Sequence, residues 1–212
     1  MNLVTLRNVG VAYEGYEALR HVDLEIADDD FLGVIGPNGG GKTTLVKAIL
    51  GTVPHTGEID LAPGLYRGKE RLIGYMPQQS DFDRAFPISV LEVVLSGLQG
   101  SRGLLARYAS DDRKKALRLL EEAGIAETAR HPIGEVSGGQ MQRALLCRAV
   151  IAEPRLLILD EPLHGLDAPA KQRIRRLTDL LTGRNSTSLI FVSHYPHEIP
   201  SGVSHTKTLM KM

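Results

Sequence analysis

The residue types that most directly predict chemistry form a glycine-rich turn ending in Lys-Thr, at residues 36–43. An apolar run at residues 31–35 precedes the turn, and residues 43–50 follow it with helical spacing and a glycine stop at Gly51. This order of strand, loop and helix suits a phosphate cradle, because loop N–H groups and a helix N-terminus converge on one anion. The candidate nucleotide-binding residues are Gly36, Pro37, Asn38, Gly39, Gly40, Gly41, Lys42, Thr43 and Thr44.

Lys42 and Thr43 have separate roles in this interpretation. The Lys42 ammonium reaches the β- and γ-phosphate oxygens, while the Thr43 hydroxyl is a ligand for Mg²⁺. The alternative is a glycine-rich loop that only turns the chain, and it leaves the complete pattern and its flanking elements unexplained. We therefore expect the chain to bind a nucleotide together with Mg²⁺.

Composition narrows the class of protein. With 212 residues and 42% hydrophobic content, the chain is long enough for one sizeable core with an inserted lobe. Its 25 basic residues balance 25 acidic ones, so no overall field draws it to nucleic acid or anionic lipid. We expect no transmembrane segment and no signal peptide, because apolar runs are short and the amino terminus lacks a basic patch. The single cysteine, Cys147, fits helix packing in a reducing compartment.

Two carboxylates follow a second apolar run at residues 156–159. This run predicts a strand buried on both faces of a parallel sheet, and ligands bind at the carboxyl ends of such strands. Asp160 is placed to hold Mg²⁺, usually through water, and Glu161 to accept a proton from an attacking water. The alternative is a solvated acidic pair, but the phosphate loop upstream favours the catalytic interpretation.

A helix start at Ser137 identifies the kind of nucleotide enzyme. Ser137 is a good N-cap with Gln140 three residues later, and Gly138 and Gly139 expose N–H donors to an anion. Taken with Gln142-Arg143 and the acidic strand that follows, this segment resembles the signature of the ATP-binding cassette (ABC) ATPases. The resemblance covers essentially the whole chain and implies ATP as the nucleotide.

The resemblance assigns roles to four further residues. Gln78 matches the glutamine that senses Mg²⁺ and the γ-phosphate, Asp167 matches the D-loop, and His194 matches the switch histidine. Tyr13 matches the aromatic residue on which adenine stacks. Their structural alternatives are a surface amide, a turn or cap, a loop histidine and a core aromatic. For Tyr13, the alternation of apolar residues over positions 9–13 also fits a core position.

The family's architecture follows by implication. It is an α/β P-loop NTPase fold with a RecA-like core, a small antiparallel β subdomain and an inserted helical subdomain. Residues 1–78 and 144–212 would form the nucleotide-binding core with the β subdomain, and residues 79–143 the helical subdomain. Apolar residues with helical spacing at positions 89–95 and 112–122 fit that insert. The short insert and single cassette argue against the DNA-repair and translation-factor branches.

The resemblance also implies a mechanism that needs two subunits. ATP bound by residues 36–43 of one subunit is capped by residues 137–139 of the other, in a head-to-tail homodimer. Glu161 then orients water, His194 stabilises the γ-phosphate, and Lys42 with Mg²⁺ absorbs the developing charge. The implied partners are integral membrane permease subunits and an extracytoplasmic substrate-binding protein. They would place the chain, as a peripheral subunit, at the cytoplasmic face of the plasma membrane.

The segment after Gln78 bears on the cargo. Residues 75–97, with Phe86-Pro87 at the centre, look like the ATPases of zinc and manganese importers. The alternative for Phe86-Pro87 is a hydrophobic staple before a helix capped by Ser89. Importers of molybdate and iron chelates share parts of the pattern. The chain after His194 looks more like soluble or molybdenum-linked cassettes, so a soluble ATPase not tied to transport is the alternative to a divalent-metal importer.

Several positions depart from the family pattern. Leu163 and His164 stand where many members have Thr or Phe and a small or polar residue, and we expect them to alter dimer contacts while sparing hydrolysis. A zinc site built from His194, His197 and His205 is disfavoured. His194 is committed to phosphate, and two prolines interrupt any helix that could carry the ligands.

Overall fold

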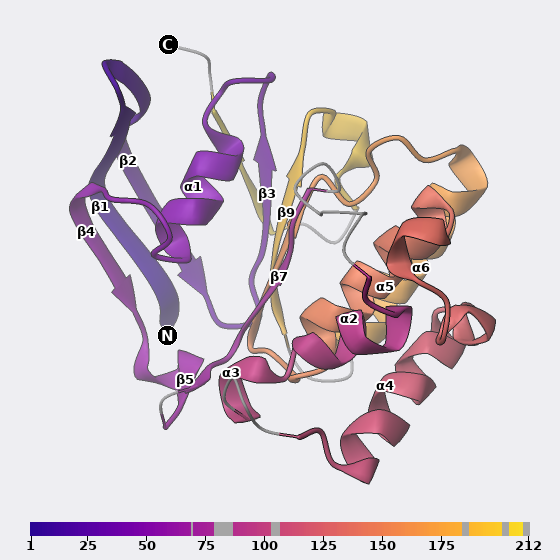
Figure 1. Cartoon of the computed structure of the whole chain (residues 1–212). Helices are drawn as coiled ribbons and strands as arrows, with labels where there is room; N and C mark the ends of the chain where they lie inside the picture. The colour runs from indigo at the N-terminus through magenta and orange to yellow at the C-terminus, as the bar shows by residue number, and fades with distance from the viewer. Residues whose placement is uncertain (69, 79–86, 103–106, 184–186, 201–203, 210–212) are drawn as a thin grey trace.

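Three groups of elements make up the structure: an antiparallel sheet, a parallel sheet and a set of helices (Figure 1). A computed structural model describes residues 1–68, 70–78, 87–102, 107–183, 187–200 and 204–209. In Figure 1 the antiparallel sheet lies on the left, the parallel sheet in the middle and most helices on the right. This arrangement confirms the predicted α/β fold with a small antiparallel subdomain.

The parallel sheet has the strand order β10-β3-β9-β8-β7. Its central strands are apolar on both faces, because Leu157 and Leu159 of β8 pack on one side while Leu156 and Ile158 pack on the other. The prediction of a doubly buried strand at this position is therefore confirmed. The strands are β3 (Phe31–Ile35), β7 (Ile73–Met76), β8 (Leu156–Asp160), β9 (Ser188–Ser193) and β10 (His205–Thr208).

The antiparallel sheet has the order β2-β1-β4, formed by β1 (Asn2–Tyr13), β2 (Tyr16–Ala27) and β4 (Thr56–Leu61). Glu14 and Gly15 connect β1 to β2 with φ angles of 31° and 85°, as a two-residue hairpin turn requires. Helix α1 (Lys42–Ile49) packs between the two sheets, in contact with β1, β2 and β8. A short ribbon, β5 (Tyr66–Arg67) and β6 (Glu70–Arg71), follows β4.

Capping boxes fix the start of two helices. Ser89 pairs with Glu92 ahead of α2, and Ser137 pairs with Gln140 ahead of α5, so both predicted N-caps are confirmed. Helix α5 contacts β7, α2, α4 and α6, and it crosses residue 143, where we placed the subdomain boundary. That division of the chain stays a prediction. The helices on this side are α2 (Val90–Ser96), α3 (Gln99–Arg102), α4 (Ser110–Glu122), α5 (Gly138–Val150) and α6 (Ala168–Gly183).

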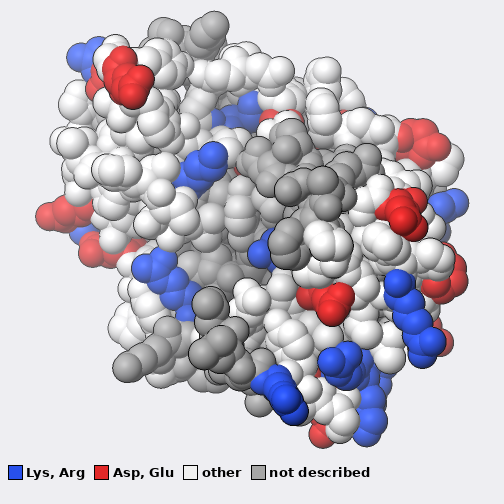
Figure 2. Space-filling view, viewed as in Figure 1, with Lys and Arg blue, Asp and Glu red and all other residues white. Residues whose placement is uncertain are grey.

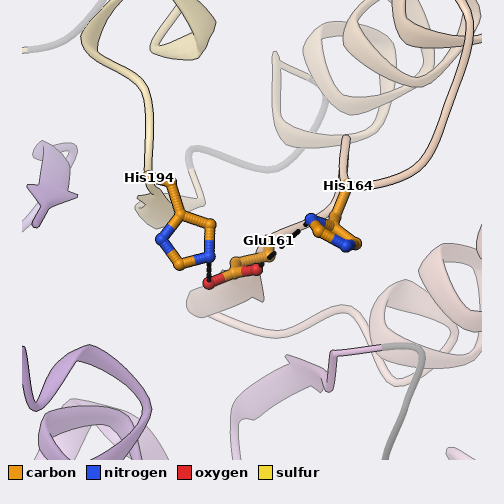
Figure 3. Close-up of side chains that lie close together, drawn as sticks. All are labelled: Glu161, His164 and His194. Atoms are coloured by element: carbon orange, nitrogen blue, oxygen red, sulfur yellow. Dashed lines mark ion pairs between the residues drawn. The ribbon is translucent and has the colours of Figure 1, made fainter. Parts of the chain in front are cut away.

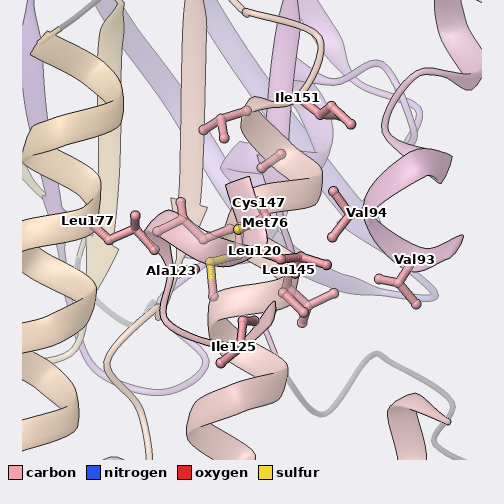
Figure 4. Close-up of a cluster of buried hydrophobic side chains, with 14 of the residues drawn as sticks. Met76, Val93, Val94, Leu120, Ala123, Ile125, Leu145, Cys147, Ile151 and Leu177 are labelled. Carbon is pink, nitrogen blue, oxygen red and sulfur yellow. The ribbon is translucent and has the colours of Figure 1, made fainter. Parts of the chain in front are cut away.

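Two hydrophobic clusters hold these layers together. One fills the space between the antiparallel sheet, α1 and the parallel sheet, and the other joins the opposite face of the parallel sheet to the helices. Figure 4 shows the second cluster, where Cys147 lies among Met76, Leu120 and Leu145. Burial raises the pKa of the Cys147 thiol to about 12, which keeps it protonated and unreactive. The predicted packing role of Cys147 is confirmed.

Charged side chains of both signs lie on the face shown in Figure 2. Among the helices that the structure describes, none is both long enough and apolar enough to cross a lipid bilayer.

Candidate active site

Four predicted site residues follow the carboxyl ends of four adjacent strands. The strands β3, β9, β8 and β7 lie side by side, and they lead to Lys42, His194, Glu161 and Gln78 respectively. Because all four strands are parallel, these residues gather at one edge of the sheet although they are distant in the sequence. The strand order therefore sets the order of side chains in the site.

The four side chains form a continuous chain of polar contacts. Nζ of Lys42 lies 2.9 Å from Nδ1 of His194, whose Nε2 lies 2.5 Å from Oε1 of Glu161. The amide of Gln78 donates to Oε2 of Glu161 at 3.0 Å. A neutral His194 protonated at Nε2 satisfies both of its contacts, since it accepts from the ammonium and donates to the carboxylate.

The phosphate loop holds Lys42 by its backbone. The ammonium donates to the carbonyl oxygens of Gly36 at 2.9 Å and Pro37 at 3.0 Å, and the loop closes on itself where Gly40 donates to Pro37. Gly41 has a φ of 84°, and a Cβ there would lie 2.4 Å from the carbonyl oxygen of Ala18. Only glycine fits this position, as a loop that exposes its N–H groups requires.

Burial lowers the pKa of Lys42, and the nearby carboxylates Glu161 and Asp160 oppose that shift. The side chains of Lys42 and Glu161 are only 4% and 5% exposed, with Nζ and Oε1 3.8 Å apart. A buried cation with a shifted pKa beside a buried carboxylate is typical of functional sites.

Glu161 has a strained backbone, with a φ of 53°. This conformation costs a residue other than glycine about 1–2 kcal/mol. Hydrogen bonds on both sides impose it, because the Glu161 N–H donates to Val192 and its carbonyl accepts from His164, each at 3.1 Å. Strain of this kind is concentrated at functional sites, and here it accompanies a carboxylate placed between His194 and Gln78.

A pocket of about 340 Å³ opens over these residues. Tyr13 is 42% exposed at the pocket, so its alternative assignment to the core is wrong. Tyr16, which the sequence analysis missed, also borders the pocket and donates to the carbonyl of Gly39 at 3.1 Å. The predicted residues that line the pocket are Tyr13, Asn38, Gly39, Gly41, Lys42, Thr43, Thr44, Gln78, Glu161 and His194.

The signature residues line a different pocket, of about 440 Å³, which Ser137, Gly138, Gly139 and Asp167 share. Within this chain they are therefore not brought together with the phosphate loop. Asp167 caps helix α6, because its carboxylate accepts from the N–H of Ala170 at 2.9 Å. Asp167 therefore acts as a helix cap in this structure, which was the structural alternative for this residue. Its D-loop role stays a prediction.

The oxygen donors predicted for Mg²⁺ suit that ion. Thr43 and Gln78 border the pocket, and Asp160 ends strand β8 one residue before Glu161. Asp160 is fully buried and close enough to Lys42 to affect its pKa. Carboxylate, hydroxyl and amide oxygens are ligands that Mg²⁺ prefers.

His164 is a neighbour of the site that sequence reasoning did not place. Its Nδ1 lies 3.8 Å from Oε2 of Glu161, and its ring centroid lies 6.3 Å from that of His194 (Figure 3). The sequence singled out His164 as a departure from the family pattern, but it did not predict that the side chain would point toward Glu161. His205, which the sequence placed in a disfavoured zinc site with His194 and His197, does not join this group; its Nδ1 lies 3.3 Å from Oδ1 of Asp30.

The segment that suggested a metal cargo is only partly described. Phe86 and the residues from 79 lie outside the described residues, while Pro87 precedes the capped helix α2.

The family model described as ABC transporter matches residues 19–164, which is more than half of the chain. The chain belongs to the ABC transporter family. Its members bind and hydrolyse ATP in coupling to transport, so this chain is an ATPase. The prediction drawn from residues 36–43, 137–140 and 160–161 is confirmed at the level of family, fold and reaction.

Similar proteins span nearly the whole chain of this ABC ATPase. It is 38% identical over 208 residues to the zinc import ATP-binding protein ZnuC of Pseudomonas entomophila (strain L48), covering 98% of this chain and 74% of that protein. It is 39% identical over 188 residues to the manganese transport system ATP-binding protein MntB of Bacillus subtilis (strain 168), covering 88% and 75%. The dimeric structure of MJ0796, a bacterial ABC transporter cassette, superposes with a TM-score of 0.82 at 26% identity, covering 98% and 94%.

Proposed function

We propose that this ABC ATPase energises an importer for a divalent metal ion of the zinc and manganese class. The observation that carries the proposal is its similarity to ATP-binding proteins of zinc import and manganese transport, which extends over 98% and 88% of the chain. The proposed partners are integral membrane permease subunits and a substrate-binding protein on the far side of the membrane. The chain then works at the cytoplasmic face as a peripheral subunit.

The working form in this proposal is a head-to-tail dimer joined by ATP. Two observations support it: the phosphate loop and the signature residues line separate pockets within one chain, and a similar cassette has been solved as a dimer. Adenine stacks on the exposed Tyr13, and the phosphates lie against the loop at residues 36–43. Residues 137–139 of the second subunit then cap the same nucleotide.

Hydrolysis in the closed dimer follows from the contacts of Glu161. Its buried carboxylate accepts a proton from the attacking water, while Lys42 and His194 stabilise the charge on the γ-phosphate. Gln78, which already contacts Glu161 at 3.0 Å, reports the presence of the phosphate. Thr43, Gln78 and Asp160 would hold Mg²⁺, which would neutralise charge on the phosphates. Loss of the γ-phosphate removes the bridge between subunits and reopens the dimer.

The test has two parts. Tagged Glu161→Gln protein is purified with ATP from gently solubilised membranes, and the proteins that accompany it are identified by mass spectrometry. A multi-span membrane protein supports a transporter, whereas a soluble partner supports the alternative of a soluble ATPase. Cellular zinc and manganese are then measured after deletion of the gene. A fall in either supports the metal cargo, and unchanged contents of both contradict it.

A further inference from the structure

We propose that Glu161, His164 and His194 form a zinc-binding site that switches the ATPase off. One ligand atom from each of these side chains lies within 4.8 Å of the other two. Within the part of the chain that the structure describes, no other His, Cys, Asp and Glu side chains group in this way. Figure 3 shows both imidazoles directed at the carboxylate from opposite sides.

The distances suit a small divalent ion. Zinc bonds of about 2.0–2.1 Å in a tetrahedral site place neighbouring ligand atoms about 3.3 Å apart. The present separations lie on either side of this value: Nε2 of His194 is 2.5 Å from Oε1 of Glu161, and Nδ1 of His164 is 3.8 Å from the other oxygen, Oε2. The side chain of His164 is 60% exposed, so it can turn toward an ion without disturbing the core. Two imidazoles and one carboxylate also form a known zinc ligand set, with water as the fourth ligand.

Neighbouring groups already orient the ligands. When Nε2 of His194 binds the ion, the ring proton moves to Nδ1, which lies 3.3 Å from the carbonyl oxygen of Gly36 and can donate to it. A histidine that binds a metal usually makes a second hydrogen bond of this kind. Lys42 loses Nδ1 as an acceptor, and its ammonium must turn away from the new Nδ1–H, while it keeps the carbonyls of Gly36 and Pro37. Gln78 continues to hold the second oxygen of Glu161.

The donor set separates this site from the Mg²⁺ site. Two nitrogen ligands favour zinc over Mg²⁺, which prefers oxygen, and zinc also binds such ligands more tightly than Mn²⁺. His164 is absent from the walls of the ATP pocket, and no step of hydrolysis uses it. Glu161 and His194 are needed for hydrolysis, so an ion that holds both of them blocks the reaction.

The physiological consequence is feedback by the imported ion. A rise in free zinc inside the cell fills the site and slows the ATPase that drives import. This last link rests on the proposed function, because it requires zinc to be the cargo. The site and its effect on hydrolysis require only the ATPase activity.

Zinc binding is tested first, without nucleotide. The full-length protein is titrated with Zn²⁺ against a chromophoric chelator, alongside His164→Ala and the control His55→Ala, which removes another exposed histidine. We expect one zinc per chain in the wild type and in the control, and binding at least 10-fold weaker in His164→Ala. No zinc bound by the wild type, or equal affinity in all three proteins, overturns the site.

Hydrolysis is then measured at constant Mg-ATP with buffered free Zn²⁺. Without zinc, His164→Ala is expected to hydrolyse ATP at the wild-type rate, and half-inhibition should require at least 10-fold more zinc than in the wild type or His55→Ala. Equal inhibition of all three overturns the switch, since it points to general displacement of Mg²⁺. Unchanged cellular zinc and manganese after gene deletion would refute the proposed cargo. The zinc titration and the hydrolysis assay on the purified protein would still decide whether the zinc site exists and inhibits the ATPase.

Discussion

Nζ of Lys42 lies 2.9 Å from Nδ1 of His194, across 152 positions of the sequence. The contact forms because β3 and β9 are adjacent parallel strands. The loop after β3 leads to Lys42 and β9 leads directly to His194, so both residues lie at the same edge of the sheet. It shows that the lysine of the phosphate loop is already held by protein groups, namely two backbone carbonyls and one imidazole. In the proposed complex with ATP, the γ-phosphate would therefore replace contacts of Lys42 rather than meet a free cation.

Removal of the Lys42 ammonium should weaken ATP binding. We expect Lys42→Ala to raise the dissociation constant at least about 10-fold, because a hydrogen bond to a charged group contributes about 1.5–3 kcal/mol. Isothermal titration with ATP and Mg²⁺ measures the effect. The matched control is Lys47→Ala in the same helix, outside the pocket. Equal dissociation constants for the two variants would show that Lys42 does not contact the phosphates.

Tyr13 provides a test of where adenine binds. If the base stacks on this ring, Tyr13→Ala should weaken ATP binding by about 1–3 kcal/mol, while Tyr13→Phe should bind normally. Stability should change little, because Tyr13 is 42% exposed. Tyr66→Ala removes a tyrosine of similar exposure, 38%, and serves as the control. Nucleotide affinity equal to the wild type in Tyr13→Ala would exclude the stacking role.

The sequence could predict those parts of the site that depend on local pattern. The apolar runs at residues 31–35 and 156–159 predict buried strands, and Ser137 with Gln140 predicts a helix start, because each pattern involves only neighbouring residues. Catalytic candidates such as Glu161 then follow from their place after a strand.

Contacts between distant segments could not be predicted in this way. The sheet order that brings His194 between Lys42 and Glu161 depends on the packing of whole strands. The direction of the His164 side chain depends on the left-handed backbone of Glu161, which residue type does not reveal. Periodicity alone placed Tyr13 inward with Val9 and Val11, but Tyr13 is the last residue of β1, beside the hairpin turn, and its side chain is 42% exposed.

Glu198 should make stability depend on pH. It lies in the short 3₁₀ turn after His194, and its buried carboxylate accepts from Lys171 and Ser193, each at 2.6 Å. Burial alone would raise the pKa of Glu198, but these two hydrogen bonds lower it below the ordinary 4.5. The carboxylate therefore stabilises the fold fully above the unfolded-state pKa, and that contribution is lost as pH falls through the lower folded-state pKa.

Urea unfolding of wild type and Glu198→Gln at several pH values measures this contribution. We expect the variant to be less stable at pH 7 by about 2 kcal/mol, as for hydrogen bonds to a charged group. The difference should shrink below about pH 4.5 as the wild-type carboxyl becomes protonated. Glu25→Gln, at an exposed position, should match the wild type throughout. A difference that stays constant down to pH 2 contradicts the assigned role of the charge.

Variants of Ser89 and Ser137, which cap helices in the same way, can distinguish an effect on helix capping from an effect on dimerisation. Ser89 and Ser137 each complete a capping box, so either change to alanine should cost about 1 kcal/mol of stability. Only Ser137 lines the signature pocket, so only Ser137→Ala should also weaken the ATP-dependent dimer. Thermal unfolding and sedimentation with ATP measure the two effects. Equal dimerisation of both variants argues against a signature role for Ser137.

The most direct test of the central claim combines sedimentation and phosphate release for Glu161→Gln with Mg-ATP. The amide keeps the size of the side chain but cannot take a proton from water. We predict that the variant binds ATP, accumulates as a dimer, and releases phosphate at less than about one hundredth of the wild-type rate, as loss of a general base implies. The exposed control Glu153→Gln should hydrolyse normally. Rapid phosphate release by Glu161→Gln, or a monomer that does not respond to ATP, would contradict the account.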